Sequence, residues 1–383
     1  MTETPSSTTS PARPRARDPF LDNARGLLIT MVVVGHTVES FHVLDQVIPD
    51  MVYTAIYSFH MAAFVAISGY LSRSYRNEPR QLKRVLSSIV APYLIFQMVH
   101  EVAKHFLEGR NLELQLFLPA WTLWFLLALL VWRLLSPLLR SLRHPLLIAV
   151  AVAVIAPLDP DLDSTFSLGR IAGMLPFFVI GLISTPETLA RIKAFRHRWL
   201  GAAVMLAALL CALVLREHVP ASMFFLREAY DEDAPVLFEM AVQVGALVTG
   251  VVGALGLLLI TPRGSSALSV LGTRSLTIYL LHPVLLLPIR YADHPPAWIH
   301  TWWFGVLLLP AAVVLTLLLG SAPVSRATRW VTDPPIGDLL IKEPAEDAGH
   351  GSGKDAAAES GQSSAGAKRT TSRAPRAPRH TRR

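Results

Sequence analysis

Cysteine is nearly absent from this sequence, and charged residues are scarce for its length. The 383 residues include a single cysteine, Cys211, so an intrachain disulfide, a cysteine-ligated zinc cluster and a redox pair are excluded. Charged residues make up 16% of the chain and hydrophobic residues 52%. One soluble domain of this length cannot bury that much apolar surface, so the composition predicts a protein whose solvent is lipid.

The net charge is +7, but the basic residues do not form a module with interleaved aromatic residues. Lys and Arg fall in short loops and at the two ends of the chain, so membrane topology explains them and no nucleic-acid partner is expected. The first 18 residues are rich in Ser, Thr, Pro and Arg and lack an apolar run. No cleavable signal peptide is predicted, and the first span is expected to be retained.

Repeated apolar stretches of nearly 20 residues predict an all-α, polytopic integral membrane protein with about ten transmembrane helices. We expect a domain at 20–335 between disordered cytoplasmic tails at 1–19 and 336–383, the second tail being basic. The short stretch from Pro145 to Pro157 counts as a crossing because it keeps the Arg191 to Arg198 cluster inside. The excess of Lys and Arg in the inner loops then predicts that both termini are cytoplasmic. The expected location of the protein is the plasma membrane. The predicted spans lie near 26–42, 51–72, 85–104, 120–138, 145–157, 167–184, 199–216, 236–261, 275–291 and 301–320.

The outer loops are acidic near 45–50, 159–163 and 228–233. Solvated loops explain these carboxylates better than a divalent cation site does, so no metal is predicted. Tryptophans near the outer span ends, Trp121 and Trp124 among them, are typical of an interfacial aromatic belt, with sugar stacking as the alternative.

The first span carries ionisable side chains along one face. Arg25 and His36 are eleven residues apart, which brings them within about 20° of one another around a helix and separates them by about 16 Å along it. Asp22 lies about 40° from the same stripe. An imidazole at mid-membrane is costly and usually marks a substrate or proton path, although hydrogen-bonded packing between helices is the alternative. Glu39, one turn outward, is suited to orient the ring.

The second span is expected to place His60 at about the depth of His36, where the two imidazoles could meet. Ser68 and Gly69 are small enough for close helix approach, and packing explains them at least as well as substrate binding. Arg73 at the inner end is either an ordinary positive-inside anchor or a partner of Arg25 in holding phosphates.

Four motifs stand out in the order of the chain. The first two are Leu21-Asp22-Asn23-Ala24-Arg25-Gly26 and Gly35-His36 at its spacing from Arg25. The others are Phe59-His60-Met61 with Ser68-Gly69-Tyr70, and Trp124-Phe125-Leu126. Together they resemble the acyltransferase-3 family over residues 18 to 335, with fucose 4-O-acetylase-like proteins as the nearest branch. The run from Ser275 through Tyr279 to His282-Pro283 is similar to a further family pattern, or else a local helix kink.

The resemblance implies an O-acyltransferase. Its donor would be acetyl-CoA or another acyl-CoA, and its acceptor a hydroxyl of an extracytoplasmic or lipid-linked carbohydrate. His36 is then the expected general base, with Asp22, Glu39 and His60 as further catalytic candidates. The expected coenzyme-binding residues are Arg25 and Arg73, and the expected substrate-binding residues are Ser68, Tyr279 and His282.

Two other classes remain open at this stage. A proton-coupled transporter or flippase of a glycolipid or small solute would use His36, His60 and His282 as a relay. No internal repeat between the chain halves supports it. A membrane sensor or scaffold would instead depend on the basic tails for its partners.

Overall fold

The computed structural model describes residues 18–109, 111–112, 115–162, 166–292 and 296–341, and every regular element within them is a helix. The predicted tails lie almost entirely outside these ranges. Of the C-terminal one, the described part includes the short helix α17 (Ile336–Leu340). The tail boundaries and their disorder therefore stay predictions.

Among the described residues, a helical segment lies at each of the ten predicted span positions. Short helices also lie between or after these segments: α9 (Pro186–Ala194), α12 (Ala267–Thr273), α15 (Ala322–Ala327) and α16 (Arg329–Thr332). The segments at the predicted positions are α1 (Pro19–Ser40), α2 (Val47–Tyr57) with α3 (His60–Leu71), α4 (Pro79–Val85) with a π-helix (Leu86–Val90) and α5 (Ala91–Glu108), α6 (Trp124–Ser141), α7 (Pro145–Ile155), α8 (Leu168–Ile183), α10 (Arg198–Val214), α11 (Val236–Ile260), α13 (Ser275–Arg290) and α14 (Trp302–Leu319).

Five of the described helices are long and apolar enough to cross a membrane. The number rises to seven if two bent pairs each form one span: α8 with α9, bent by 91°, and α12 with α13, bent by 76°. The helices α7 and α10 are apolar but shorter. The all-helical membrane architecture is thus confirmed, whereas the count of ten crossings stays a prediction. The five are Val47–Leu71, Pro79–Glu108, Trp121–Ser141, Val236–Ile260 and Trp302–Leu319.

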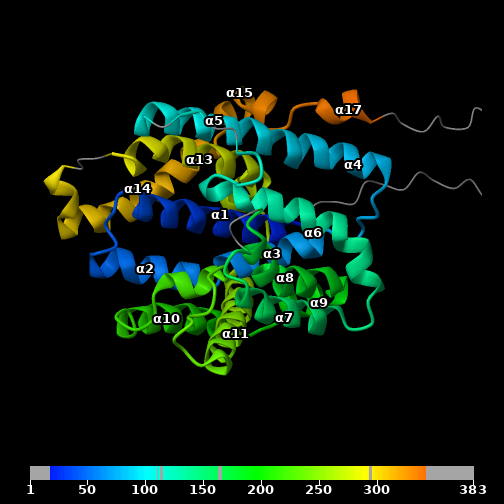
Figure 1. The fold of residues 1–383 in the computed structure, drawn as a ribbon, viewed down its shortest axis with the longest axis horizontal. Coiled ribbons are helices and arrows are strands. Elements are labelled where there is room, and N and C mark those ends of the chain that lie inside the picture. The colour runs from blue at the N-terminus through cyan, green and yellow to red at the C-terminus, as the bar shows by residue number, and fades with distance from the viewer. Residues whose placement is uncertain (1–17, 110, 113–114, 163–165, 293–295, 342–383) are drawn as a thin grey trace, which may run out of the picture. The chain divides into compact units, whose positions relative to one another are not determined.

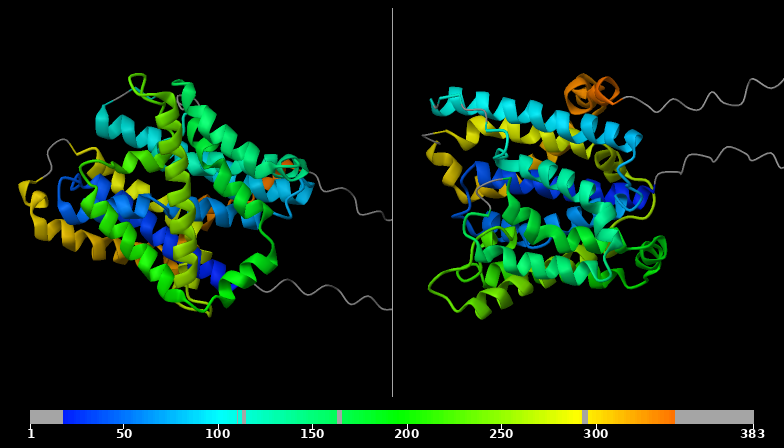
Figure 2. Two further views of the ribbon diagram at one scale, coloured as in Figure 1. Left: turned by 90° about the horizontal axis from the view of Figure 1, so that it is seen from below. Right: turned by 45° about the vertical axis from the view of Figure 1, so that its right-hand side comes forward.

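Helix α1 lies among α2, α3, α12, α13 and α14 and contacts all of them (Figures 1 and 2). Asp18 caps its first turn by accepting a hydrogen bond from the Phe20 amide at 3.1 Å. Gly272 of α12 packs so closely on the Asp22 carbonyl that a side chain there would collide with it. This close crossing holds the N-terminal half of α1 against the start of α13.

Asn23, in the motif that begins at Leu21, is completely buried and organises the loop before α12. Its amide donates to the carbonyls of Pro262 and Gly264 at 2.9 and 2.6 Å. Its oxygen accepts from the hydroxyls of Ser266 and Ser269, each at 2.7 Å. Because the buried Asn23 side chain is fully used in bonds to this loop and to the start of α12, Asn23 is a structural residue that fixes the motif's neighbours in place.

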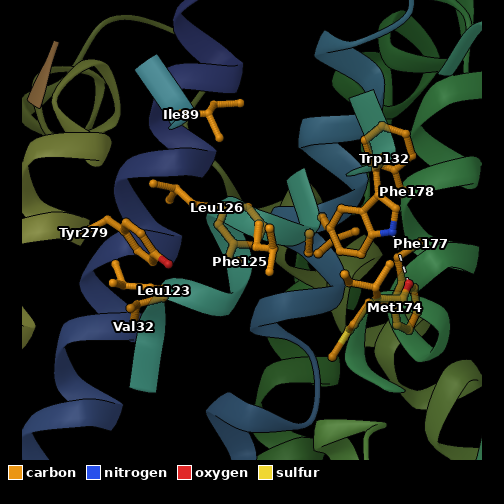
Figure 3. Packing of buried hydrophobic residues seen from close by; sticks show 14 of the residues in the cluster. Val32, Ile89, Leu123, Phe125, Leu126, Trp132, Met174, Phe177, Phe178 and Tyr279 are labelled. Atoms are coloured by element: carbon orange, nitrogen blue, oxygen red, sulfur yellow. Dashed lines mark hydrogen bonds between the residues drawn. The ribbon is translucent and has the colours of Figure 1, made fainter. Parts of the chain in front are cut away.

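Helices α3 and α8 approach each other as closely as the Ser68-Gly69 pair predicts. Gly69 lies against the carbonyl of Phe178, and Gly181 of α8 lies against the carbonyl of Ala66. Beside this crossing, the buried Trp132 ring of α6 stacks on Phe178 with ring centroids 5.4 Å apart (Figure 3). The same hydrophobic cluster includes Tyr279 of α13, so it joins α6, α8 and α13 around α1.

Two irregularities interrupt the helices. The span from Val47 to Leu71 breaks at Ser58 and Phe59, so that His60 begins a new helix. Between α4 and α5 the chain forms one π-helical turn just before Pro92, whose ring nitrogen has no hydrogen to donate. Both breaks lie next to cavities described below.

Candidate active site

Two cavities meet at His36. The inner cavity has a volume of 240 Å³ and the outer cavity 480 Å³, and both are lined by His36, Met61 and Trp124. The imidazole side chain is 16% exposed, so it is accessible from these spaces rather than sealed in apolar packing. His36 is thus placed where two molecules entering from different cavities would come together.

The inner cavity extends from His36 toward the N-terminal end of α1. It is lined by Arg25 on α1, by Ser68 on α3 and by Arg133 on α6. Arg25 lies about 16 Å from His36 along α1, and Arg133 lies about 13 Å from Trp124 along α6. The two guanidinium groups therefore lie at similar depth, at the far end of the cavity, and the shared face predicted for Arg25 and His36 is confirmed.

Arg25 contacts the start of α13 and its own helix α1. It donates to the Ser275 hydroxyl at 2.6 Å and forms an ion pair with Asp22 at 3.5 Å. Asp22 is therefore a partner of Arg25, and it lies fourteen residues before His36 on α1. Its ion pair is with the guanidinium, and it lies too far along the helix to contact the imidazole, so a catalytic role for Asp22 stays a prediction.

Glu39 and Tyr57 both contact the Nδ1 atom of His36, at 3.2 and 3.3 Å. The other Glu39 oxygen accepts a hydrogen bond from Arg290 at 2.8 Å. Because a carboxylate only accepts, the proton of neutral His36 belongs on Nδ1, which leaves the lone pair on Nε2. This is the tautomer that a general base requires, and Arg290 holds the carboxylate that selects it.

Rings on several sides fix the plane of the imidazole. Trp121 packs edge-on at 4.9 Å between centroids, and His282 stacks at 5.5 Å. The Tyr57 ring comes so close to the helix at Gly35 that an added Cβ would lie 2.7 Å from its Cε2 atom. The glycine before His36 therefore makes room for the tyrosine that contacts His36.

The other two predicted histidines each use Nδ1 to bind a backbone carbonyl four residues earlier in the chain, which for His60 lies in the preceding helix α2. His60 donates to the Ile56 carbonyl at 2.8 Å, and His282 to the Ile278 carbonyl at 2.9 Å. His60 lines the outer cavity, and Tyr57 packs beside it at 4.7 Å. The Nε2 atom of His282 is buried and has no hydrogen-bond partner among the described residues. His282 itself is completely buried and lines neither cavity, so its predicted role in substrate binding stays a prediction.

Ser68 and Tyr279 both line the inner cavity. The Ser68 hydroxyl donates to the Phe64 carbonyl at 2.9 Å, so Gly69 packs on α8 while Ser68 faces the cavity. The Tyr279 hydroxyl donates to the backbone carbonyl of Thr122. These contacts agree with a substrate-binding role for both residues, which stays a prediction.

Arg73 lies away from this arrangement. Its guanidinium stacks on the Tyr70 ring at 3.6 Å and donates to the carbonyls of Tyr70 and Ser184 at 2.8 and 3.2 Å. It is not among the residues that line the inner cavity. The structure does not bring Arg73 together with Arg25, and these contacts favour the anchor interpretation over a phosphate clamp.

The outer cavity is polar, aromatic and basic. Glu39, His60 and the rings of Tyr53, Tyr57, Trp121, Trp124, Phe225 and Tyr291 line it, together with the cations Lys104, Arg170, Arg227 and Arg290. Within the part of the chain that is described, no group of three or more His, Cys, Asp or Glu side chains could hold a metal ion.

Residues 18–321 match the acyltransferase-3 family model, which describes an acyltransferase domain. The chain belongs to this family. It is also similar to nodulation protein NolL of Mesorhizobium japonicum, with 42% identity over 64 residues. That alignment covers 16% of this chain and 17% of NolL. No solved structure matches the chain. The matches support an acyltransferase, do not favour the transporter or flippase interpretation, and leave the fucose 4-O-acetylase-like branch unconfirmed.

Sequence reasoning missed several residues of this candidate site. Arg133 interrupts the apolar run of α6, and an intramembrane arginine is itself a signal of a functional site. Tyr57 and Arg290 carry no comparable signal, because a tyrosine or arginine near a span end is ordinary. Only the packing of α2 and α13 against α1 brings them to His36 and Glu39.

Proposed function

We propose that this acyltransferase-3 family protein is a membrane O-acyltransferase. It moves an acyl group, acetyl in the simplest case, from cytoplasmic acyl-CoA to a hydroxyl of an extracytoplasmic or lipid-linked carbohydrate. The position of His36 at the junction of the two cavities carries this proposal. A transfer enzyme needs one reacting group accessible to both donor and acceptor.

The donor occupies the inner cavity. Arg25 and Arg133 at its far end suit the phosphates of coenzyme A, whose charge cannot enter lipid unpaired. The volume of 240 Å³ is too small for the whole coenzyme but suits a thioester arm that extends toward His36. The mostly apolar lining, with Phe64, Phe125 and Leu126, keeps water away from the thioester and limits hydrolysis.

The acceptor enters from the outer cavity, and His36 acts as general base. Nε2 removes the proton from the attacking hydroxyl as its oxygen bonds to the thioester carbonyl carbon. When the tetrahedral intermediate collapses, the carbon–sulfur bond breaks and the CoA thiolate takes the proton from the imidazolium. Glu39 stabilises that imidazolium, and Arg290 orients Glu39. An ester and free CoA are the products.

This direction of transfer requires the predicted topology, with the N-terminal end of α1 facing the cytoplasm. The Arg25 end of the inner cavity is then the cytoplasmic one, and the outer cavity faces the other side of the plasma membrane. The proposed topology also places both tails of the chain in the cytoplasm. Labelling a cysteine introduced at Ser265 or at Glu232 from either side of sealed vesicles tests it, because the two positions should react from opposite sides.

The deciding experiment uses the full chain in lipid nanodiscs. With acetyl-CoA and glycans extracted from cells deleted for this protein, it should release free CoA and form an ester that mass spectrometry detects. His36→Ala should reduce turnover by roughly 10²- to 10⁴-fold, the range that general bases contribute. His144→Ala is the matched control, since His144 is exposed at the start of α7. Undiminished turnover in His36→Ala would end the proposal.

A further inference from the structure

An apolar cavity of 520 Å³ lies between α10 and α11, beside the end of α2. Most of its lining side chains are hydrocarbon. The Ser58 hydroxyl in its wall donates to the Ala55 carbonyl at 2.8 Å. The Thr249 hydroxyl donates to the Gly245 carbonyl at 2.9 Å. Because these protons are already used, the cavity offers water few hydrogen-bond partners and suits an apolar guest better.

Small residues line both helices beside this apolar cavity, yet they pack tightly only at one end. Near the start of α10, a side chain added at Gly201 would collide with the carbonyl of Gly256. At Gly245, an added side chain would meet no atom within 4 Å. Small residues normally let two helices approach closely, but here they leave a space between α10 and α11. The small lining residues are Ala207, Ala208 and Ala212 of α10 and Gly245, Ala246 and Gly253 of α11.

The two helices that enclose the apolar cavity lie at the edge of the helix bundle (Figure 1). Leu206 and Leu210 of α10 are 56% and 51% exposed, and Val248 of α11 is 56% exposed. In a membrane protein, exposed apolar side chains of this kind face lipid. A hydrocarbon chain can therefore reach the cavity directly from the bilayer.

The apolar cavity adjoins the outer cavity at the break between α2 and α3. Ser58 and Phe59, which form the break, line the apolar cavity. Tyr57 and His60, on either side of them, line the outer cavity. Phe224 lines both. A molecule with a polar head and an apolar chain would thus find adjoining spaces that match its two parts.

We infer that the acceptor is a glycolipid, whose sugar occupies the outer cavity while its hydrocarbon chain lies between α10 and α11. The inference rests on the proposed function, because it names the acceptor class of the same site. Along α11 the apolar cavity extends from Val242 to Gly253, about 16 Å, so it accommodates an extended chain. In the predicted topology it begins about 9 Å from the outer end of α11, within the hydrocarbon of the outer leaflet.

Photochemical cross-linking to the full chain in phosphatidylcholine nanodiscs tests the inference. The ligand is dodecyl β-glucoside with a diazirine at the end of its chain, and mass spectrometry locates the residues that it labels. Labelling of α10 and α11 beside the apolar cavity should exceed labelling of α14 by roughly tenfold, the preference that one or two hydrogen bonds to the sugar would give. Helix α14 is the internal reference, because its exposed Leu307 and Leu318 line none of the cavities described.

Two variants fill the apolar cavity from opposite walls. Gly245→Leu adds a side chain where there is space and also favours the helix, and Ala207→Phe does the same from α10. Each should reduce labelling of the cavity to the level of α14. Partition of the glucoside into the bilayer is the same for every variant, so it cancels. Gly264→Leu is the matched control, since Gly264 also has open space around it but lies in the loop before α12.

Turnover distinguishes a glycolipid from a free sugar. Envelope glycans from cells deleted for this protein are divided into an organic-soluble and a water-soluble fraction, and each is given to the wild type with acetyl-CoA. The ester should form in the organic-soluble fraction. Gly245→Leu should raise the KM for that fraction by about tenfold and leave the KM for acetyl-CoA unchanged.

Three results would overturn the inference. The glucoside labels the apolar cavity no more than α14, dodecanol with the same diazirine labels the cavity as strongly as the glucoside, or the ester forms only in the water-soluble fraction. The second result means that the cavity holds ordinary bilayer lipid, and the third that the acceptor is a free sugar. Failure of the proposed function is separate, because it appears as absent CoA release with either fraction, while the labelling pattern still decides whether a glycolipid binds.

Discussion

The inner and outer cavities differ in size, polarity and charge, although one imidazole lines both. The inner cavity is narrow and mostly apolar, with its guanidiniums at the end farthest from His36. The outer cavity has twice the volume, and polar groups, rings and cations surround it. A narrow apolar passage selects a thin chain with a charged end, whereas a wide polar space accepts a ring with many hydrogen-bonding groups. The difference indicates two chemically unlike substrates.

The strongest test of this contrast is Arg25→Gln, which removes charge only from the inner cavity. The KM for acetyl-CoA should rise by about 10- to 100-fold, because a charge-assisted contact to a phosphate is lost. The KM for the acceptor should not change. Steady-state kinetics with each substrate varied separately would check this. Arg263→Gln is the control, since Arg263 lies exposed near the same end and donates to the Phe195 carbonyl. An equal rise in both KM values would contradict the assignment of the inner cavity to the donor.

Glu39→Gln tests the role of Glu39 beside His36, where the two cavities meet. It keeps the shape of the side chain but removes the charge that holds the Nδ1 proton of His36 and stabilises the imidazolium. We expect kcat to fall by roughly 10- to 100-fold with both KM values nearly unchanged, a part of the full general-base contribution. Glu217→Gln, at an exposed carboxylate, should leave kcat unaltered. A change confined to the acceptor KM would instead make Glu39 a substrate-binding residue.

Arg73→Gln should have the smallest effect on catalysis. Because Arg73 contacts Tyr70 and Ser184 and not the inner cavity, the KM for acetyl-CoA should change by less than about twofold, within the range of an ordinary surface substitution. Its thermal unfolding temperature should fall slightly, as two contacts to backbone carbonyls are lost. A tenfold rise in the KM for acetyl-CoA would restore the predicted phosphate clamp and extend the donor site toward α8.

The sequence predicted the helices better than the contacts between them. Each predicted span position holds a helix because apolar runs of this length leave the backbone no other way to satisfy its hydrogen bonds in lipid. The break at Ser58 and the π-helical turn before Pro92 were not predicted. Both are local departures from regular geometry that an apolar pattern does not reveal.

In the candidate site too, the sequence placed residues of one helix correctly but did not predict the contacts between helices. The spacing of Arg25 and His36 was sufficient to place both on one face, since a helix repeats at a constant angle. The predicted pairing of Arg73 with Arg25 rested only on the similar depth of the two residues in the membrane. The structure instead brings Arg133 to the inner cavity, because the face that a residue presents depends on how its helix is rotated against its neighbours.

By itself, the sequence determined that the chain is helical and lies in lipid, and that one helix carries Asp22, Arg25, His36 and Glu39 in order. Those features depend only on composition and on the local repeat of the helix. The tertiary structure alone decided that Arg290, 251 residues after Glu39, would hold that carboxylate, and that two cavities would meet at His36. Contacts across such separations arise from the packing of whole helices, which no local pattern specifies.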